Sequence, residues 1–234
     1  QHPRGAGAIA EIAQRRQGGR GVVAAQRAGA ALRLGRTATA DDVIALRPDV
    51  AILATGSTMI PPDWLPADIA AEGWVPDLRT AMAQVLRYDI VQPGTAVLFD
   101  ADHTEGTYAA AEALKSRFER VLVVTPRDTI ANDVHMTGRQ GILRRLAEQR
   151  IEVVVLSEPR WSDACADGKL ELVNVYNGDV RVVEDLALLT YATPRVPNDA
   201  MAAPLRAAGI EVVAVGDARA PQEMLFATAS GHAA

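Results

Sequence analysis

Short apolar runs rich in Val, Ile and Leu alternate along the chain with longer stretches in which apolar residues recur every three or four positions. The first pattern is typical of buried strands and the second of helices that pack on a sheet. This alternation predicts an α/β fold with largely parallel sheets. The expected strands are residues 31–34, 50–53, 95–99, 120–124, 151–155, 169–175, 180–184, 186–190 and 211–215. The expected helices are residues 8–17, 22–29, 78–87, 107–117, 137–149 and 201–208, a short one after Thr39, and one starting near Pro221.

Local turn chemistry supports several of these boundaries. Thr39 and Asp77 precede helical stretches and carry side-chain oxygens that can accept hydrogen bonds from free helical N–H groups. The sequence Tyr-Asn-Gly-Asp at 176–179 separates two β-rich runs, which indicates a β-hairpin. Residues 61–76 are rich in proline and predict a surface excursion.

Composition narrows the class of protein. The 234 residues suffice for one large or two small domains, and no apolar run approaches the roughly 20 residues of a membrane helix. The single cysteine, Cys165, cannot form an internal disulfide or a thiolate metal cage. We therefore expect a cytoplasmic chain that neither enters a membrane nor holds a metal.

Charge is unevenly distributed. Residues 1–36 contain seven Arg and one Glu, a net charge of +6, so the remaining residues carry −11 of the total of −5. No aromatic side chains lie among these arginines to stack on bases, so we expect a solvated or docking surface and no nucleic-acid partner.

Two strand ends carry residues suited to a nucleotide. Residues 50–53 are followed by Ala54, Thr55 and Gly56, and residues 212–215 by Gly216 and Asp217. Open α/β sheets bind ligands beyond the carboxyl ends of their strands. Small residues permit close approach of a dinucleotide, and a carboxylate can accept hydrogen bonds from sugar or ribityl hydroxyls. Each turn alone is equally compatible with an ordinary tight turn.

A third strand end has the shape of a nicotinamide site without its chemistry. Asp102, Thr104 and Thr107 occupy the positions where a G-x-G-x-x-G loop would have glycines. Their side chains would crowd and repel a pyrophosphate. The next strand ends in Thr125-Pro126-Arg127, without the acidic residue that binds an adenosine ribose. We expect neither NAD nor NADP here.

The same stretch supports an alternative reading. An apolar strand followed by Asp100-x-Asp102-x-Thr104 resembles the first motif of haloacid-dehalogenase-type phosphatases. That resemblance would make Asp100 a nucleophile and Asp102 an acid/base beside Mg²⁺, with Thr125 and Arg144 or Arg145 as further motif residues. Asp217 is followed by Ala218-Arg219-Ala220-Pro221, which lacks the nearby carboxylate expected to complete the metal site. His103 and His135 have no partner cluster at ligand spacing, so we expect them to be structural or exposed.

Taken together, the strand ends match a known arrangement. The stretches that carry the resemblance are residues 32–35, 39–43, 50–57, 96–114, 134–146, 215–221 and 227–232, with 215–221 the most specific. From about Leu32 to its end the chain resembles the C-terminal region of the trimethylamine dehydrogenase-like flavoproteins, which include amine dehydrogenases and dimethylglycine and N-methylproline demethylases. Asp102 in place of glycine resembles the amine dehydrogenase branch.

The resemblance implies two Rossmann-like domains, one inserted in the other. Residues 1–92 and 186–234 would form a partial FAD- or ADP-binding domain, and residues 93–185 the inserted domain. Ala54, Thr55, Gly56, Gly216 and Asp217 would line the FAD or ADP site. No catalytic residue is expected, because in that family the substrate is oxidised in a separate barrel that holds FMN and a 4Fe-4S cluster and passes electrons to an electron-transfer flavoprotein.

The barrel, its cluster cysteines and the first βαβ unit with its glycine-rich loop have no counterpart in the sequence. A parallel sheet without its first strand exposes an unpaired edge. We therefore expect a partner polypeptide that carries the flavin and iron–sulfur barrel together with the missing unit, or a chain that is a fragment of a longer protein. The alternative within the same fold is a non-catalytic structural subunit whose nucleotide site has decayed.

Overall fold

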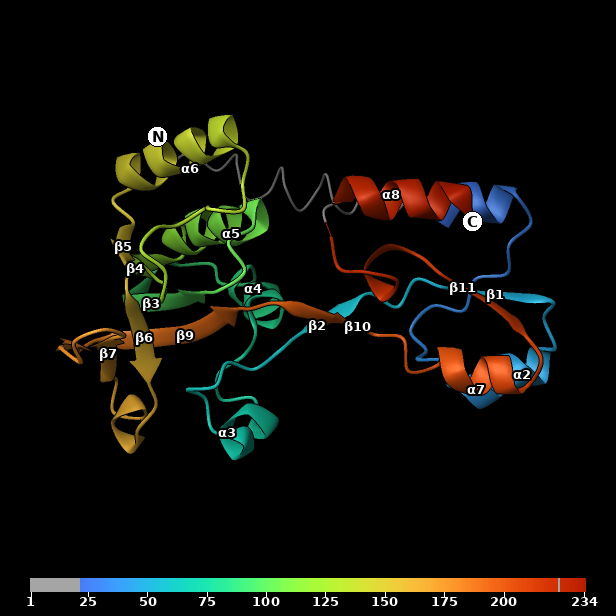
Figure 1. Cartoon of the computed structure of the whole chain (residues 1–234), viewed down its shortest axis with the longest axis horizontal. Helices are drawn as coiled ribbons and strands as arrows, with labels where there is room; N and C mark the ends of the chain where they lie inside the picture. Colours follow the sequence, from blue (N-terminus) through green and yellow to red (C-terminus); the bar gives the residue numbers. More distant parts are fainter. Residues whose placement is uncertain (1–21, 223) are drawn as a thin grey trace. The chain divides into compact units, whose positions relative to one another are not determined.

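The computed structural model describes residues 22–222 and 224–234. They form two compact units: unit 1 comprises the residues up to Ser57 and from Pro197 onward, and unit 2 comprises Thr58–Val196. Unit 2 is thus inserted in unit 1 (Figure 1). The α/β class, the mostly parallel sheets and the insertion of one domain in the other are confirmed.

The two units divide the chain at other residues than the predicted domains, whose boundaries lay at 92/93 and 185/186. Strand β9 (Leu186–Ala192) pairs in parallel with β3 (Gln92–Asp100), and α4 (Leu78–Val85) packs against β9 and α5 (Glu105–Lys115). These contacts place residues 58–92 and 186–196 in the inserted unit.

Unit 2 is built on a four-stranded parallel sheet in the order β5-β4-β3-β9, with β4 at Phe118–Val124 and β5 at Glu152–Val154. Helix α5 lies over β3 and β4, and α6 (Met136–Glu148) packs outside α5 (Figure 1). An antiparallel sheet of β6 (Ser157–Arg160), β7 (Leu170–Asn174) and β8 (Val180–Val183) contributes to the same core. The predicted hairpin at 176–179 joins β7 and β8. The remaining elements of the unit are α3 (Ala67–Glu72) and the short 3₁₀ helix η1 (Asp163–Cys165).

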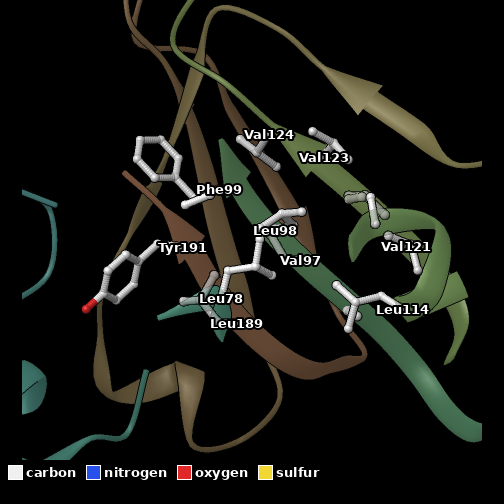
Figure 2. Close-up of a cluster of buried hydrophobic side chains, with 14 of the residues drawn as sticks. Leu78, Val97, Leu98, Phe99, Leu114, Val121, Val123, Val124, Leu189 and Tyr191 are labelled. Atoms are coloured by element: carbon white, nitrogen blue, oxygen red, sulfur yellow. The ribbon is translucent and has the colours of Figure 1, made fainter. Parts of the chain in front are cut away.

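The core of unit 2 explains why its strands are continuously apolar. Both faces of β3 are covered, so Thr95 to Asp100 are all buried. Figure 2 shows Val97, Leu98 and Phe99 of β3 packed among side chains from neighbouring strands and helices. Alternation of polar and apolar residues is lost wherever a parallel strand is buried on both sides.

Unit 1 contains a two-stranded parallel sheet of β1 (Val50–Leu53) and β11 (Glu211–Ala214). Helices α2 (Ala40–Leu46) and α7 (Ala202–Ala207) pack on one face of it. Its other elements are a helix at residues 22–27, the 3₁₀ helix η2 (Gly216–Ala218) and α8 (Met224–Ala233). Strands β2 (Ser57–Met59) and β10 (Arg195–Pro197) pair with each other where the chain passes between the units.

Capping residues behave as predicted, whereas one strand prediction is wrong. The Thr39 side chain accepts from Asp42 N–H at the start of α2, and Asp77 accepts from the N–H groups of Arg79 and Thr80 at the start of α4. Residues 31–34 form no strand, because no described strand lies beside them to complete a ladder. The predicted helix at 8–17 lies outside the described residues. No helix among the described residues is long and apolar enough to cross a membrane.

Candidate functional site

The carboxyl ends of β1 and β11 lie side by side in unit 1. The strands pair in parallel with Leu53 opposite Ala214, and Val215 N–H donates to Leu53 O over 2.9 Å. The turns at 54–57 and 215–217 therefore leave the sheet at the same edge. This is the edge at which open α/β sheets bind ligands.

The turn after β1 is open on its outer side. Gly56 has a φ of +77°, a conformation that strongly favours glycine, and a Cβ added there would meet no other atom within 4 Å. Among the described residues, the N–H groups of Ala54, Thr55 and Gly56 donate to no protein acceptor. Consecutive backbone N–H groups without protein acceptors can bind the oxygens of an anionic ligand.

The turn after β11 is held from behind by α8. Gly216 has a φ of +58° and donates its N–H to Ser230 Oγ over 2.8 Å. A Cβ at Gly216 would lie 3.4 Å from the Cβ of Ala227, so helix and turn are in close contact. Asp217 accepts from Ser57 Oγ at 2.7 Å and from Gln222 N–H at 3.3 Å.

The bond between Ser57 and Asp217 joins the two turns directly. An ionised carboxylate can accept about four hydrogen bonds, so Asp217 can accept a ligand hydroxyl in addition to its protein partners. The structure thus brings Ala54, Gly56, Gly216 and Asp217 to one edge. Thr55 lies in the same turn, but its hydroxyl donates to the backbone oxygen of Asn198.

In unit 2, the turn after β3 is closed by its own carboxylate. Asp102 accepts from Thr104 N–H at 3.1 Å and from Thr107 Oγ1 at 2.6 Å, at the amino-terminal end of α5. This is where the pyrophosphate of a dinucleotide would need backbone N–H groups and no negative charge. The side chains at the three expected glycine positions are bonded to one another instead of leaving a space.

Asp100 belongs to a buried hydrogen-bond network. Its carboxylate accepts from Tyr108 OH at 2.6 Å and from His103 N–H at 2.9 Å. The Tyr108 oxygen in turn accepts from Ala131 N–H at 2.5 Å, and His103 Nε2 lies 3.2 Å from Thr125 Oγ1. Burial raises the pKa of Asp100, although the hydrogen bond from Tyr108 and the charge of His103 oppose the shift. Burial and the neighbouring Asp100 raise the pKa of Tyr108 as well.

This geometry argues against the phosphatase reading. Asp100 has no exposed surface, so its carboxylate cannot reach a phosphate ester. Thr125 is bonded to His103, while Arg144 and Arg145 pair with Glu148 and Glu112 respectively. The described residues include no group of three or more His, Cys, Asp or Glu side chains arranged to hold a metal ion.

The two histidines differ in their surroundings. His103 is fully buried with a positive φ of 53°, and its ring nitrogens contact Tyr108 and Thr125. It is therefore structural. His135 is exposed at the amino-terminal end of α6, where Nδ1 lies 3.1 Å from Thr137 Oγ1.

No protein-family model matches the chain, and no curated protein matches it either. Its fold matches several solved structures. Histamine dehydrogenase from Rhizobium sp. 4-9 superimposes with a TM-score of 0.64 at 24% identity, over 85% of this chain and 32% of its own. The 6-hydroxypseudooxynicotine amine oxidase from Pseudomonas geniculata N1 gives a TM-score of 0.69 at 18% identity, over 87% and 31%.

The fold resembles that of the C-terminal region of the trimethylamine dehydrogenase-like flavoproteins, as predicted. Thioredoxin reductase from Lactococcus lactis has a related fold, with a TM-score of 0.56 at 18% identity over 77% of this chain and 61% of its own. At these identities the likeness establishes the fold. The chain spans about a third of the length of the two amine-oxidising enzymes.

The predicted site residues do not include three residues that shape the two turns, although Ser57 and Ser230 lie within the stretches that carry the family resemblance. Ser57, Asn198 and Ser230 each donate to or accept from a turn residue, yet all three are small polar residues typical of any loop. Ser57 directly follows Gly56, and its proximity to a strand end could have indicated a role. Asn198 lies 143 residues after Thr55, and nothing local in the sequence connects them.

Proposed function

We propose that this chain is the nucleotide-binding part of a flavin-dependent oxidoreductase that acts on N-methylated amines or related amino-acid derivatives. The observation that carries the proposal is the meeting of the turns after β1 and β11 at one sheet edge, with Gly56 open and Asp217 beside it. The fold shared with two amine-oxidising enzymes supports the reaction class.

The ligand of unit 1 is FAD or ADP. The N–H groups of residues 54–56 would face the phosphates or the adenosine, and the Asp217 carboxylate would accept a hydrogen bond from a ribose or ribityl hydroxyl. The residues present fit such a group, because Gly56 leaves free space where any side chain would project. FAD would supply two-electron redox chemistry, while ADP would have only a structural role.

The substrate chemistry belongs to a part that this sequence does not contain. By resemblance, an FMN and a 4Fe-4S cluster on a barrel would oxidise the amine and transfer electrons to an electron-transfer flavoprotein. No residue of this chain is assigned a catalytic role. Unit 2, whose α5 terminus is closed by Asp102, would have no need to bind a nicotinamide cofactor.

The surface of unit 1 supports association with a polypeptide that carries the barrel and the missing βαβ unit. Val215 N–H donates to Leu53 O, so the backbone groups of Leu53 point sideways toward β11. Because this direction alternates along a parallel strand, the backbone groups of Val50 and Ile52 point away from β11, to the side of β1 where no described strand pairs with them. Their side chains are 46% and 56% exposed, because Ala51 and Leu53 face the helices. An apolar parallel strand is rarely stable with one face and one edge uncovered.

Helix α8 gives independent support for such a partner. It is rich in apolar residues, and its few polar side chains, Thr228, Ser230 and His232, do not gather on one face. None of its residues is buried, and Met224, Leu225 and Phe226 are strongly exposed. Helices of this kind are normally covered on several sides. The matching fold in the two amine-oxidising enzymes is part of chains about three times as long.

Titration of the full chain with ADP and with FAD in an isothermal calorimeter tests the proposed site. We expect saturable binding that Gly56→Ala weakens about five- to thirtyfold, because a Cβ disfavours the positive φ of the turn by about 1–2 kcal/mol. Gly178→Ala is the matched control, since Gly178 has a φ of +75° with equally open surroundings but lies in the β7–β8 hairpin. Its binding should equal that of the wild type.

A second pair of variants tests the carboxylate. Asp217→Asn should weaken binding, whereas Asp49→Asn, an exposed position at the opposite end of β1, should not. Absence of binding by the wild-type chain, together with preparations that contain no flavin or adenine nucleotide by mass spectrometry, would favour the structural subunit with a decayed site.

A further inference from the structure

Three hydrogen bonds fasten the turn after β1 to Asn198. The Thr55 hydroxyl donates to the Asn198 backbone oxygen, Asn198 N–H donates to Gly56 O over 2.9 Å, and Asn198 Nδ2 donates to Thr55 O over 3.4 Å. Thr55 and Gly56 are thus held by a residue 143 positions away in the sequence. We refer to these three bonds as the 55–198 clamp.

The clamp adds little to the stability of the unit. Thr55 and Asn198 are both exposed, and neither belongs to the small core formed around Ala51 and Leu53. Exposed hydrogen bonds contribute on the order of 1 kcal/mol or less each, because water can replace either partner. Their main effect is therefore local, on the range of conformations that residues 54–56 can adopt.

The hydrogen bonds of the clamp determine which backbone donors and acceptors of the turn remain available to a ligand. It occupies the carbonyl oxygens of Thr55 and Gly56 and the Thr55 hydroxyl, and it leaves the three N–H groups of residues 54–56 without a protein acceptor among the described residues. Acceptors are thus turned toward Asn198, and donors remain for a ligand. A turn of this polarity favours an anionic, oxygen-rich ligand.

We propose that Thr55 and Asn198 are positioning residues that keep the turn at 54–56 in its ligand-receiving conformation, and that the Thr55 hydroxyl is not itself a ligand group. The inference rests on the proposed binding of an adenine nucleotide in unit 1. Ordering the backbone of a free residue costs about 1–2 kcal/mol, so a turn that is fixed before binding spares the ligand that cost.

Hydrogen exchange in the absence of nucleotide separates positioning from direct contact. Thr55→Val keeps the shape of the side chain and removes its donor, whereas Thr55→Ser retains the donor. We expect the Asn198 amide, which donates to Gly56 O, to exchange about fivefold faster in Thr55→Val than in the wild type, as loss of a bond worth about 1 kcal/mol implies. Thr55→Ser should be close to the wild type. Asn198→Ala removes only the longest bond and should have a smaller effect.

The same variants are then titrated with ADP. We expect the affinity to fall about fivefold in Thr55→Val, less in Asn198→Ala, and to be retained in Thr55→Ser. Thr58→Val is the matched control, because Thr58 is exposed in β2, three residues along the same segment, and lies outside the clamp. Exchange and affinity should both be unchanged in this variant.

Each result decides between the two claims. If Thr55→Val lowers ADP affinity while its exchange without nucleotide is unchanged, Thr55 is a direct ligand and the positioning role is refuted. If neither quantity changes although the wild type binds ADP, the clamp is irrelevant and the proposed function stands. If the wild type binds neither ADP nor FAD, the proposed function fails and the positioning role fails with it.

Discussion

Replacing Tyr108 by Phe tests the assignment of the buried network in unit 2 to structure. The variant keeps the ring and removes an oxygen that donates to Asp100 at 2.6 Å and accepts from Ala131 N–H at 2.5 Å. Asp100, Tyr108 and Ala131 are all fully buried, so water cannot replace the lost partner. Two buried polar groups are left short of a hydrogen bond at once.

The expected loss follows from these two groups. An unsatisfied buried group costs about 1–3 kcal/mol, and Asp100 keeps its bond from His103 N–H, so the total should be about 2–4 kcal/mol. For a unit of this size that corresponds to a fall of roughly 10 °C in melting temperature. A typical domain is stable by only about 5–15 kcal/mol, so the loss is a large part of the total.

Tryptophan fluorescence of the full chain in urea measures this change in unit 2 alone, because Trp64, Trp74 and Trp161 all lie in that unit. Tyr88→Phe is the matched control: its ring contacts Phe118 edge-on at 6.1 Å, and no described residue bonds its hydroxyl. We expect it to change the free energy of unfolding by less than about 0.5 kcal/mol. A Tyr108→Phe variant as stable as Tyr88→Phe would refute the network.

The remaining predictions concern pH, the nicotinamide site and the free edge of β1. Because burial raises the pKa of Asp100 above 3.8, the native state holds the proton more tightly, and the free energy of unfolding should fall as pH rises from about 4 through the native pKa. Asp100→Asn should remove this pH dependence when the free energy of unfolding is measured by urea titration at several pH values. The wild-type chain should have no phosphatase activity that this substitution could abolish. NADH should not bind the wild-type chain in fluorescence titrations, and wild-type binding whose affinity changes in Asp102→Asn would contradict the closed turn. Ile52→Lys should lower self-association of the chain in ultracentrifugation and its binding of a hydrophobic dye in fluorescence assays. Val180→Lys, on an exposed strand of unit 2, should change neither.

The fold was predictable because its main elements carry strong local signals. The buried run at 95–99 forms part of β3, and the helical period at 107–117 corresponds to α5. Asp77 precedes α4, and its side-chain oxygen caps that helix. Such signals depend only on neighbouring residues. The strand at 31–34 failed for the complementary reason, since a four-residue apolar run becomes a strand only if another strand pairs with it.

The features of the candidate site that depend on single residues could also be predicted, whereas those that depend on contacts between distant segments could not. Gly56 and Gly216 could be identified from sequence because positive φ is a property of one residue, and both have it in the structure. That the two turns meet follows from the parallel pairing of β1 and β11, which the alternating pattern only suggested. The role of Asn198 could not be predicted, because it depends on how the chain returns from unit 2, 143 residues after Thr55.

The turns after β1 and β3 differ in which hydrogen-bonding groups they leave for a ligand. After β3, the Asp102 carboxylate lies at the α5 terminus and accepts from Thr104 N–H and the Thr107 hydroxyl, donors that a phosphate could otherwise use. After β1, the acceptors are bonded to Asn198 and the donors remain free of protein partners among the described residues. Under the proposed function, the N–H groups of unit 1 would attract the phosphates of a nucleotide and the Asp102 carboxylate of unit 2 would repel them, even though both turns follow a parallel strand of similar apolar character.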